Sequence, residues 1–153
     1  MARIKIDLPG NFPFITNIEV RITDINYGGH VGNDSILSIL QEARVRFFNH
    51  YGYTELNLEG VGMIMSDVGI EFKAELFYGE KITASVAAGN FSKVSFDIFY
   101  KLEKIAADAR PDDPVGRGKT IPVAYAKSGV VTYDYQQKKI VPVPGAVRAK
   151  MNG

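Results

Sequence analysis

Apolar and polar residues alternate along much of the chain, and this period of two is the pattern of a half-buried β-strand. The clearest run covers residues 14–23, where Ile18, Val20 and Ile22 alternate with charged or polar neighbours. Comparable runs predict four further strands: residues 62–76, 80–88, 93–104 and 121–135. Glycine and asparagine separate several of these runs, as in the turns that join neighbouring strands.

One long segment departs from this period and repeats with the spacing of an α-helix. Between residues 35 and 50 the apolar positions fall on one broad face: Ile36, Leu40, Ala43 and Phe47. We expect Asn33 or Asp34 to cap the start of this helix and Gly52 to follow its end.

The predicted order, one strand, one long helix and then four or more strands, indicates an α+β fold. A curved antiparallel sheet of about five to six strands wrapped around the helix would bury the apolar face of that helix. Such a sheet leaves an edge strand with unpaired N–H and C=O groups, so we expect it to pair with a second copy. Residues 106–119 are predicted to form a long exposed hairpin loop, and residues 142–153 to fray.

Composition narrows the class of protein. With 153 residues, 46% hydrophobic and 23% charged, the chain fits a single globular domain over residues 1–153, with peripheral tails at 1–13 and 142–153. A net charge of +1 with scattered basic residues gives no basis for a nucleic-acid or anionic-membrane partner. The absence of cysteine excludes disulfides, thiolate metal sites and a cysteine nucleophile. The N-terminus does not resemble a signal peptide and no apolar segment is long enough to span a membrane, so the expected location is the cytoplasm.

The segment with the most candidate chemistry lies directly before the predicted helix. It reads Asp24-Ile25-Asn26-Tyr27-Gly28-Gly29-His30-Val31-Gly32-Asn33. Here His30 and two amide side chains, Asn26 and Asn33, stand next to the free N–H groups of a helix N-terminus, which favour negative charge. A thioester carbonyl attacked by water develops such a charge, and histidine exchanges protons near neutral pH.

This segment resembles the signature of hotdog-fold thioesterases of the 4-hydroxybenzoyl-CoA and acyl-carrier-protein thioesterase type. In that family, Asp-x-Asp, a small polar stretch and His-Val-Asn-Asn precede the central helix. The similarity continues through three further segments of the chain: Gln41-Glu42-Ala43-Arg44, Tyr51-Gly52-Tyr53 and Phe77-Tyr78-Gly79-Glu80. The resemblance implies a hotdog fold, a homodimer or a dimer of dimers, and hydrolysis of acyl-CoA or acyl-carrier-protein thioesters.

The sequence departs from the family pattern at two positions. Asn26 stands where the family has its catalytic aspartate, and Gly32 replaces the first asparagine of His-Val-Asn-Asn. An amide cannot act as a general base or nucleophile. The candidate catalytic groups are therefore His30 together with Asn26, then Glu42 on the helix, with Asp24 as a further carboxylate.

We expect six residues to contact the substrate: Tyr27, Gly28, Gly29 and Asn33, with Ser66 and Asp67 reaching across a dimer interface. Helix-terminal N–H groups, including that of Gly29 or His30, would polarise the thioester carbonyl. Neither a metal nor an organic cofactor is expected, since CoA or pantetheine belongs to the substrate.

Other interpretations remain open. His30 can simply anchor the loop, Glu42 can pair with Arg46 one helical turn away, and the asparagines can serve turns and caps. The protein can also be an acyl-thioester binder without hydrolytic activity, a hydroxyacyl-thioester dehydratase, or a structural interaction domain.

Overall fold

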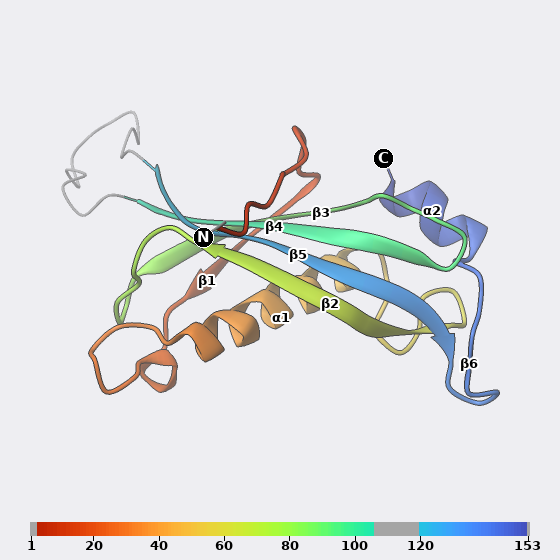
Figure 1. Ribbon diagram of the computed structural model, residues 1–153, viewed down its shortest axis with the longest axis horizontal. Coiled ribbons are helices and arrows are strands. Elements are labelled where there is room, and N and C mark those ends of the chain that lie inside the picture. Colours follow the sequence, from red (N-terminus) through yellow and green to blue (C-terminus); the bar gives the residue numbers. More distant parts are fainter. Residues whose placement is uncertain (1–2, 106–119, 153) are drawn as a thin grey trace.

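The computed structural model describes residues 3–105 and 120–152. Its elements follow the order expected from the sequence, with one strand, a long helix and then a run of strands (Figure 1). They are β1 (Phe14–Glu19), the short 3-10 helix η1 (Ile22–Asp24), α1 (Asn33–His50), β2 (Gly62–Phe72), β3 (Lys81–Gly89), β4 (Ser95–Ile105), β5 (Thr120–Asp134), β6 (Lys139–Ile140) and α2 (Gly145–Met151). The long hairpin loop expected over residues 106–119 lies outside the described residues.

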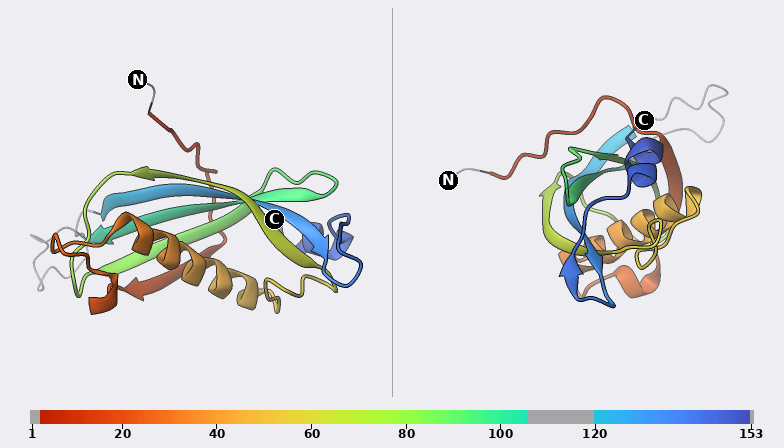
Figure 2. Two further views of the ribbon diagram at one scale, coloured as in Figure 1. Left: turned by 60° about the horizontal axis from the view of Figure 1, so that its bottom comes forward. Right: turned by 90° about the vertical axis from the view of Figure 1, so that its right-hand side faces the viewer.

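All strand pairs are antiparallel, and the six-stranded sheet has the order β1-β3-β4-β5-β2, with β6 pairing β5. The sheet curves around α1, which lies along its concave face (Figure 2). The predicted α+β arrangement of a central helix and a curved antiparallel sheet is confirmed. Strands β1 and β2 form the two edges.

The core lies between α1 and the concave face of the sheet. All four residues of the predicted helical stripe are at most 4% exposed: Ile36, Leu40, Ala43 and Phe47. They meet inward-facing strand residues such as Ile98, Tyr100 and Ala126, which are fully buried. Truncating a fully buried phenylalanine such as Phe47 to alanine typically costs about 3–5 kcal/mol, so this contact fixes the helix against the sheet.

The first strand is shorter than its alternating pattern predicts. β1 ends at Glu19, and Ile22, expected on the buried face, is 66% exposed. The reason is Asp24, whose carboxylate accepts the backbone N–H of Arg21 at 2.8 Å and so closes the 3-10 turn. A local side-chain-to-backbone hydrogen bond therefore overrides the strand pattern at this point.

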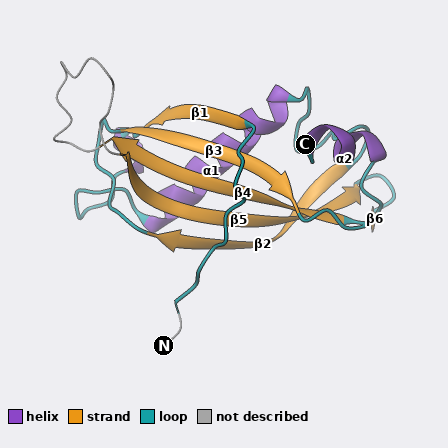
Figure 3. Ribbon diagram, turned by 90° about the horizontal axis from the view of Figure 1, so that it is seen from above, coloured by secondary structure: helices purple, strands orange, loops and turns teal. Residues whose placement is uncertain are grey.

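Fraying at the C-terminal end was expected and is wrong for most of that segment. Helix α2 covers Gly145–Met151, and Val143, Val147 and Met151 are at most 7% exposed. Val147 and Met151 lie four positions apart on one face of α2, and Val143 is buried just before the helix begins. α2 lies beside the sheet at the end opposite the start of α1 (Figures 1 and 3).

The N-terminal segment crosses the convex face of the sheet, away from α1 (Figure 3). The backbone N–H of Ile6 donates to Glu71 Oε1 on β2 at 3.1 Å, and the ring of Phe12 lies 5.0 Å from the ammonium of Lys101 on β4. Among the described residues, the helices are too short or too polar to cross a lipid bilayer.

Candidate active site at the N-terminus of the central helix

The loop between η1 and α1 is closed by its own backbone. The N–H of Asn26 donates to the carbonyl of His30 at 2.9 Å, and the N–H of Gly29 donates to the carbonyl of Asn26 at 3.1 Å. Asn26 Oδ1 also accepts the N–H of Gly28 at 2.9 Å. Gly29 has a φ of +86°, a conformation that residues with a Cβ rarely adopt. The loop is thus a compact turn with the exposed Tyr27 at its tip.

Two backbone hydrogen bonds fix this turn to the rest of the fold. The N–H of Val31 donates to the carbonyl of Leu76 at 2.8 Å, and the N–H of Gly32 donates to the carbonyl of Asp24 at 3.3 Å. Leu76 belongs to the segment that follows β2, which ends at Phe72 rather than continuing to residue 76 as expected. That segment therefore forms one wall of the site.

Helix α1 begins without a side-chain cap. Its N-cap is Gly32, whereas Asn33 and Asp34, the expected capping residues, are its first two helical residues. Within the described part of the chain, the backbone N–H groups of Asn33 and Asp34 donate to no acceptor. They are available to an anion or a polarised carbonyl at the positive end of the helix. The N–H of Gly29, expected to serve in this way, is instead used by the turn.

The tautomer of His30 follows from one contact. Its Nδ1 lies 3.2 Å from the carbonyl oxygen of Val31. A carbonyl oxygen only accepts, so Nδ1 carries a proton, and in the neutral ring Nε2 has the lone pair. A Cβ built on Gly28 would stand 3.6 Å from His30 Nε2 and 3.2 Å from Asn26 Oδ1. The two side chains therefore flank the same point beside Gly28.

A cavity of about 290 Å³ opens between this loop, the start of α1 and the segment after β2. Its walls are formed by His30, Val31, Asn33, Ile36, Phe72, Lys73, Ala74, Glu75 and Leu76. Lys73 and Glu75 were not among the expected site residues. The alternating pattern assigned them to a strand, and nothing in the sequence indicated that this strand end meets His30.

Glu42 does not line the cavity that holds His30. Its carboxylate pairs with Arg46 at 3.3 Å, one helical turn away, and it borders a separate hollow together with Arg21 and Asp24. Asp24 is buried and bound to Arg21, both by its backbone and by its guanidinium. The carboxylates of Asp24 and Glu42 are thus engaged in local structure.

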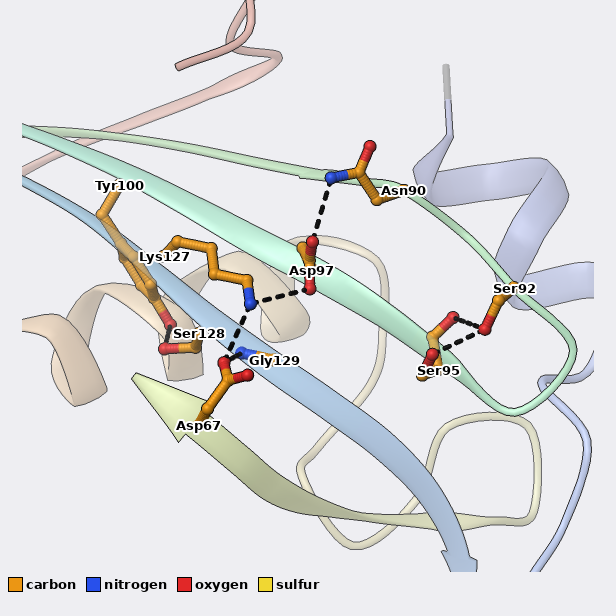
Figure 4. A network of polar contacts seen from close by, with 9 residues as sticks. All are labelled: Asp67, Asn90, Ser92, Ser95, Asp97, Tyr100, Lys127, Ser128 and Gly129. Atoms are coloured by element: carbon orange, nitrogen blue, oxygen red, sulfur yellow. Dashed lines mark hydrogen bonds and ion pairs between the residues drawn. The ribbon is translucent and has the colours of Figure 1, made fainter. Parts of the chain in front are cut away.

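Ser66 and Asp67 lie where β2 is irregular, at a break in register between Met65 and Asp67. Asp67 Oδ1 accepts the Lys127 ammonium at 2.9 Å and the N–H of Gly129 at 3.0 Å, and Lys127 also lies 3.5 Å from Asp97 (Figure 4). The hydrogen bond with Lys127 is the main cause that lowers the pKa of Asp67 and raises that of Lys127. Asp97 alternates with buried core residues, so this network lies on the convex face of the sheet.

The site holds one histidine and scattered carboxylates rather than a metal-binding set. Within residues 3–105 and 120–152, no three histidine or carboxylate side chains are grouped closely enough to hold a metal ion. The arrangement places a ring nitrogen able to accept a proton, Nε2 of His30, next to the N–H groups of a helix terminus.

Solved structures share this architecture at low sequence identity. A thioesterase superfamily protein from Jannaschia sp. CCS1 is 20% identical with a TM-score of 0.76, covering 94% of this chain and 83% of that chain. A 1,4-dihydroxy-2-naphthoyl-CoA thioesterase from Synechocystis is 16% identical with a TM-score of 0.72, covering 92% and 98%. A point mutant of 4-hydroxybenzoyl-CoA thioesterase, complexed with 4-hydroxybenzoyl-CoA, is 15% identical with a TM-score of 0.75, covering 90% and 97%. These likenesses establish the hotdog fold.

The sequence itself gives the family. Among curated proteins, none matches significantly. The sequence profile of the thioesterase-like superfamily, however, matches residues 20–151, which include the loop, the central helix and the whole sheet after β1. The chain belongs to the thioesterase-like superfamily.

Proposed function

We propose that the protein hydrolyses an acyl thioester, either an acyl-CoA or an acyl-carrier-protein conjugate, to the free acid and the thiol. The observation that carries this proposal is the contact between His30 Nδ1 and the Val31 carbonyl, which leaves Nε2 as a base beside the start of α1. Membership of the thioesterase-like superfamily supports the same reaction.

In the proposed reaction, a water oxygen attacks the thioester carbonyl carbon while His30 Nε2 takes one proton from that water. The carbonyl oxygen becomes negative and is stabilised by the backbone N–H groups of Asn33 and Asp34. The intermediate then collapses, the C–S bond breaks, and the leaving thiolate takes the proton from His30. Protons and electrons balance without a metal or an organic cofactor.

Asn26 has a supporting role in this scheme. Its Oδ1 already accepts the N–H of Gly28, so its Nδ2 is the group that remains to donate. That nitrogen stands 3.6 Å from where a Cβ of Gly32 would be, next to the helix N-terminus. We therefore assign Asn26 as a donor to the substrate carbonyl or the attacking water. Unlike the aspartate usual in the family, it adds no negative charge beside the developing oxyanion.

We further propose that the working unit is a homodimer, or a dimer of dimers, formed through the edge strand β2. Unpaired strand edges are joined to another chain in many sheets. Four large apolar side chains of this strand are at least 37% exposed: Ile64, Met65, Val68 and Phe72. In this arrangement the acyl chain lies beside α1, and Ser66 and Asp67 of one copy reach toward the pantetheine arm bound by the other.

A second function is favoured by one observation. Asn26 occupies the position at which this family carries a catalytic carboxylate, and Glu42 lies in a different hollow from His30. A protein that binds acyl thioesters without cleaving them would need the N–H groups at the start of α1 and a cavity for the acyl chain. It would not need a general base.

The two functions are separated by thiol release, followed with dithionitrobenzoate, across short, long and aromatic acyl-CoAs. Binding of the same compounds is measured by calorimetry with non-hydrolysable thioether analogues. Turnover well above the uncatalysed rate supports the hydrolase. Tight binding of an analogue with no thiol released from the matching thioester would instead establish the binder.

A further inference from the structure

A second hollow lies further along α1 than the cavity that holds His30. It has a volume of about 180 Å³, well above the ~30 Å³ that one water molecule occupies in the liquid. Its walls are formed by Leu37, Ser38, Leu40, Gln41, Arg44, Met65, Val68 and Ser128. Leu37 lies one helical turn beyond Asn33, so the two hollows follow the same side of the helix, facing β2.

Four of these eight lining residues are apolar, and the inner side carries a chain of buried polar groups. Arg44 Nη1 donates to the hydroxyl of Tyr100 at 3.2 Å, and that hydroxyl donates to Ser128 Oγ at 3.0 Å. The contact between Tyr100 and Ser128, behind β5, is drawn in Figure 4. The Arg44 side chain is 6% exposed, Ser128 is 1% exposed and Tyr100 is fully buried.

This chain has a direction, because a guanidinium can only donate. Tyr100 must accept from Arg44 and pass its own proton toward Ser128. Burial raises the pKa of Tyr100, which keeps its hydroxyl protonated and donating. Ser128 is then left with one hydroxyl hydrogen, and within the described residues no side-chain or backbone acceptor takes it. A buried donor without an acceptor is costly, and the hollow is where one can enter.

We propose that this hollow binds the distal part of the acyl group and that Ser128 donates a hydrogen bond to an oxygen carried there. The inference rests on the proposed function, since it specifies the substrate class of the same site. The substrate is then an acyl thioester with an apolar chain that bears a hydroxyl or keto group far from the thioester.

The charge balance selects a neutral oxygen over a carboxylate. Arg44 Nε donates to Glu55 Oε1 at 2.6 Å, so the positive charge behind Tyr100 is already paired. A carboxylate entering the hollow would lose its hydration without an uncompensated cation to replace it. A hydroxyl or a ketone loses much less on burial and gains the donor of Ser128.

The register of β2 sets the distance between thioester and oxygen. Phe72 borders the cavity with His30, and Val68, which pairs with Ser128, borders the second hollow. Four residues of strand span roughly 13 Å. At the roughly 1.2 Å per bond of an extended chain, the oxygen stands about eleven bonds from the thioester carbon.

The test compares matched pairs of acyl-CoAs, plain and ω-hydroxylated, with eight, ten and twelve carbons, together with their ω-carboxylated counterparts. Their relative kcat/KM, and the relative Kd of the corresponding thioether analogues, are measured for the wild type, Ser128→Ala and Ser85→Ala. Ser85 is a matched control because it is buried, 3% exposed, on β3 and lines none of the hollows along α1. We expect the preference for the hydroxylated compound to fall about five-fold in Ser128→Ala, the size of one hydrogen bond, and to persist in Ser85→Ala.

The outcomes separate this inference from the proposed function. Hydrolysis of both compounds at equal kcat/KM, with no effect of Ser128→Ala, would overturn the inference and leave the hydrolase in place. Binding with the expected preference but without thiol release would overturn the hydrolase and support the inference. An equal or stronger preference for ω-carboxylated acyl groups would show that the charge argument, and with it the neutral substrate class, is wrong.

Discussion

His30 Nδ1 and the carbonyl oxygen of its neighbour Val31 lie 3.2 Å apart, and this contact fixes which ring nitrogen carries the proton. Val31 is held in turn by the hydrogen bond from its own N–H to the carbonyl of Leu76, at 2.8 Å. The orientation of the histidine is thus set by the backbone on both sides of the site. A histidine held in this way needs no aspartate partner to select its tautomer.

Removing the base should abolish most of the turnover. His30→Gln keeps a polar side chain of similar size but cannot take the water proton, and loss of general-base catalysis typically costs about 10²–10⁴-fold. We expect kcat for thiol release to fall by at least 100-fold. The matched control is His50→Gln, which changes the other histidine, packed against Phe14 and Tyr51 at the far end of α1. Equal losses in both variants would contradict a catalytic role for His30.

The variant Asn26→Asp tests whether Asn26 acts as a hydrogen-bond donor or only stands in place of a lost carboxylate base. An aspartate can still accept the N–H of Gly28, so the turn should keep its shape. It has no N–H to donate, however, and brings a negative charge next to the developing oxyanion. We expect kcat to fall roughly ten- to 100-fold, as when a single oxyanion donor is lost. A gain in kcat would mean that Asn26 marks the loss of a carboxylate base, and the mechanism proposed for His30 would be wrong.

The loop and helix of the candidate site could be predicted from the sequence because each depends on residues that are close together in the chain. The glycines and asparagines of residues 24–33 predict a turn, and the three- and four-residue spacing of Ile36, Leu40, Ala43 and Phe47 predicts the buried face of the helix. Capping residues were less predictable. Asn33 and Asp34 have capping side chains, yet Gly32 takes the N-cap position because Asn26 and Asp24 already direct the backbone into the helix.

Features that depend on distant parts of the chain were not predicted. Glu75 and Lys73 join the cavity of His30 only because the segment after β2 pairs with Val31. The chain from Arg44 through Tyr100 to Ser128 joins α1, β4 and β5, and each member alone reads as an ordinary helix or strand residue. Helix α2 was missed because its stripe is short, and a seven-residue helix is stable only when packed against the sheet.

The network on the convex face predicts a pH dependence of stability. Because Lys127 lowers the pKa of Asp67, the charged carboxylate stabilises the folded state above the pKa of unfolded aspartate, about 3.9. That contribution disappears as the pH falls through the lower folded-state pKa. We expect Asp67→Asn to reduce the free energy of unfolding at neutral pH by less than about 1 kcal/mol, since this pair is largely exposed.

Denaturant titrations between neutral pH and the acid-unfolding range measure this effect. The difference between wild type and Asp67→Asn should shrink as the pH is lowered. Asp7→Asn is the control, because Asp7 makes no hydrogen bond to any described residue. A difference that grows toward acid pH would contradict the assigned role of Lys127.

The buried pair of Arg44 and Glu55 should matter far more for stability than the exposed pair of Arg46 and Glu42. Arg44→Met keeps the length of the side chain but leaves the Glu55 carboxylate and the Tyr100 hydroxyl without their donor. Removing one partner of a buried charge pair costs about 3–5 kcal/mol, and the partial exposure of Glu55 places the expected loss near the lower end. Arg46→Met, on the surface of the same helix, loses an exposed ion pair and two hydrogen bonds to β1, and should cost about 1–2 kcal/mol. Urea unfolding of both variants compares the two losses in the free energy of unfolding. The double mutant Arg44→Met/Glu55→Gln measures the coupling between the two members of the buried pair. Similar losses for the two arginines, or strict additivity in the double mutant, would show that Arg44 is held mainly by packing of its aliphatic stem, and that its hydrogen bond to Tyr100 contributes little.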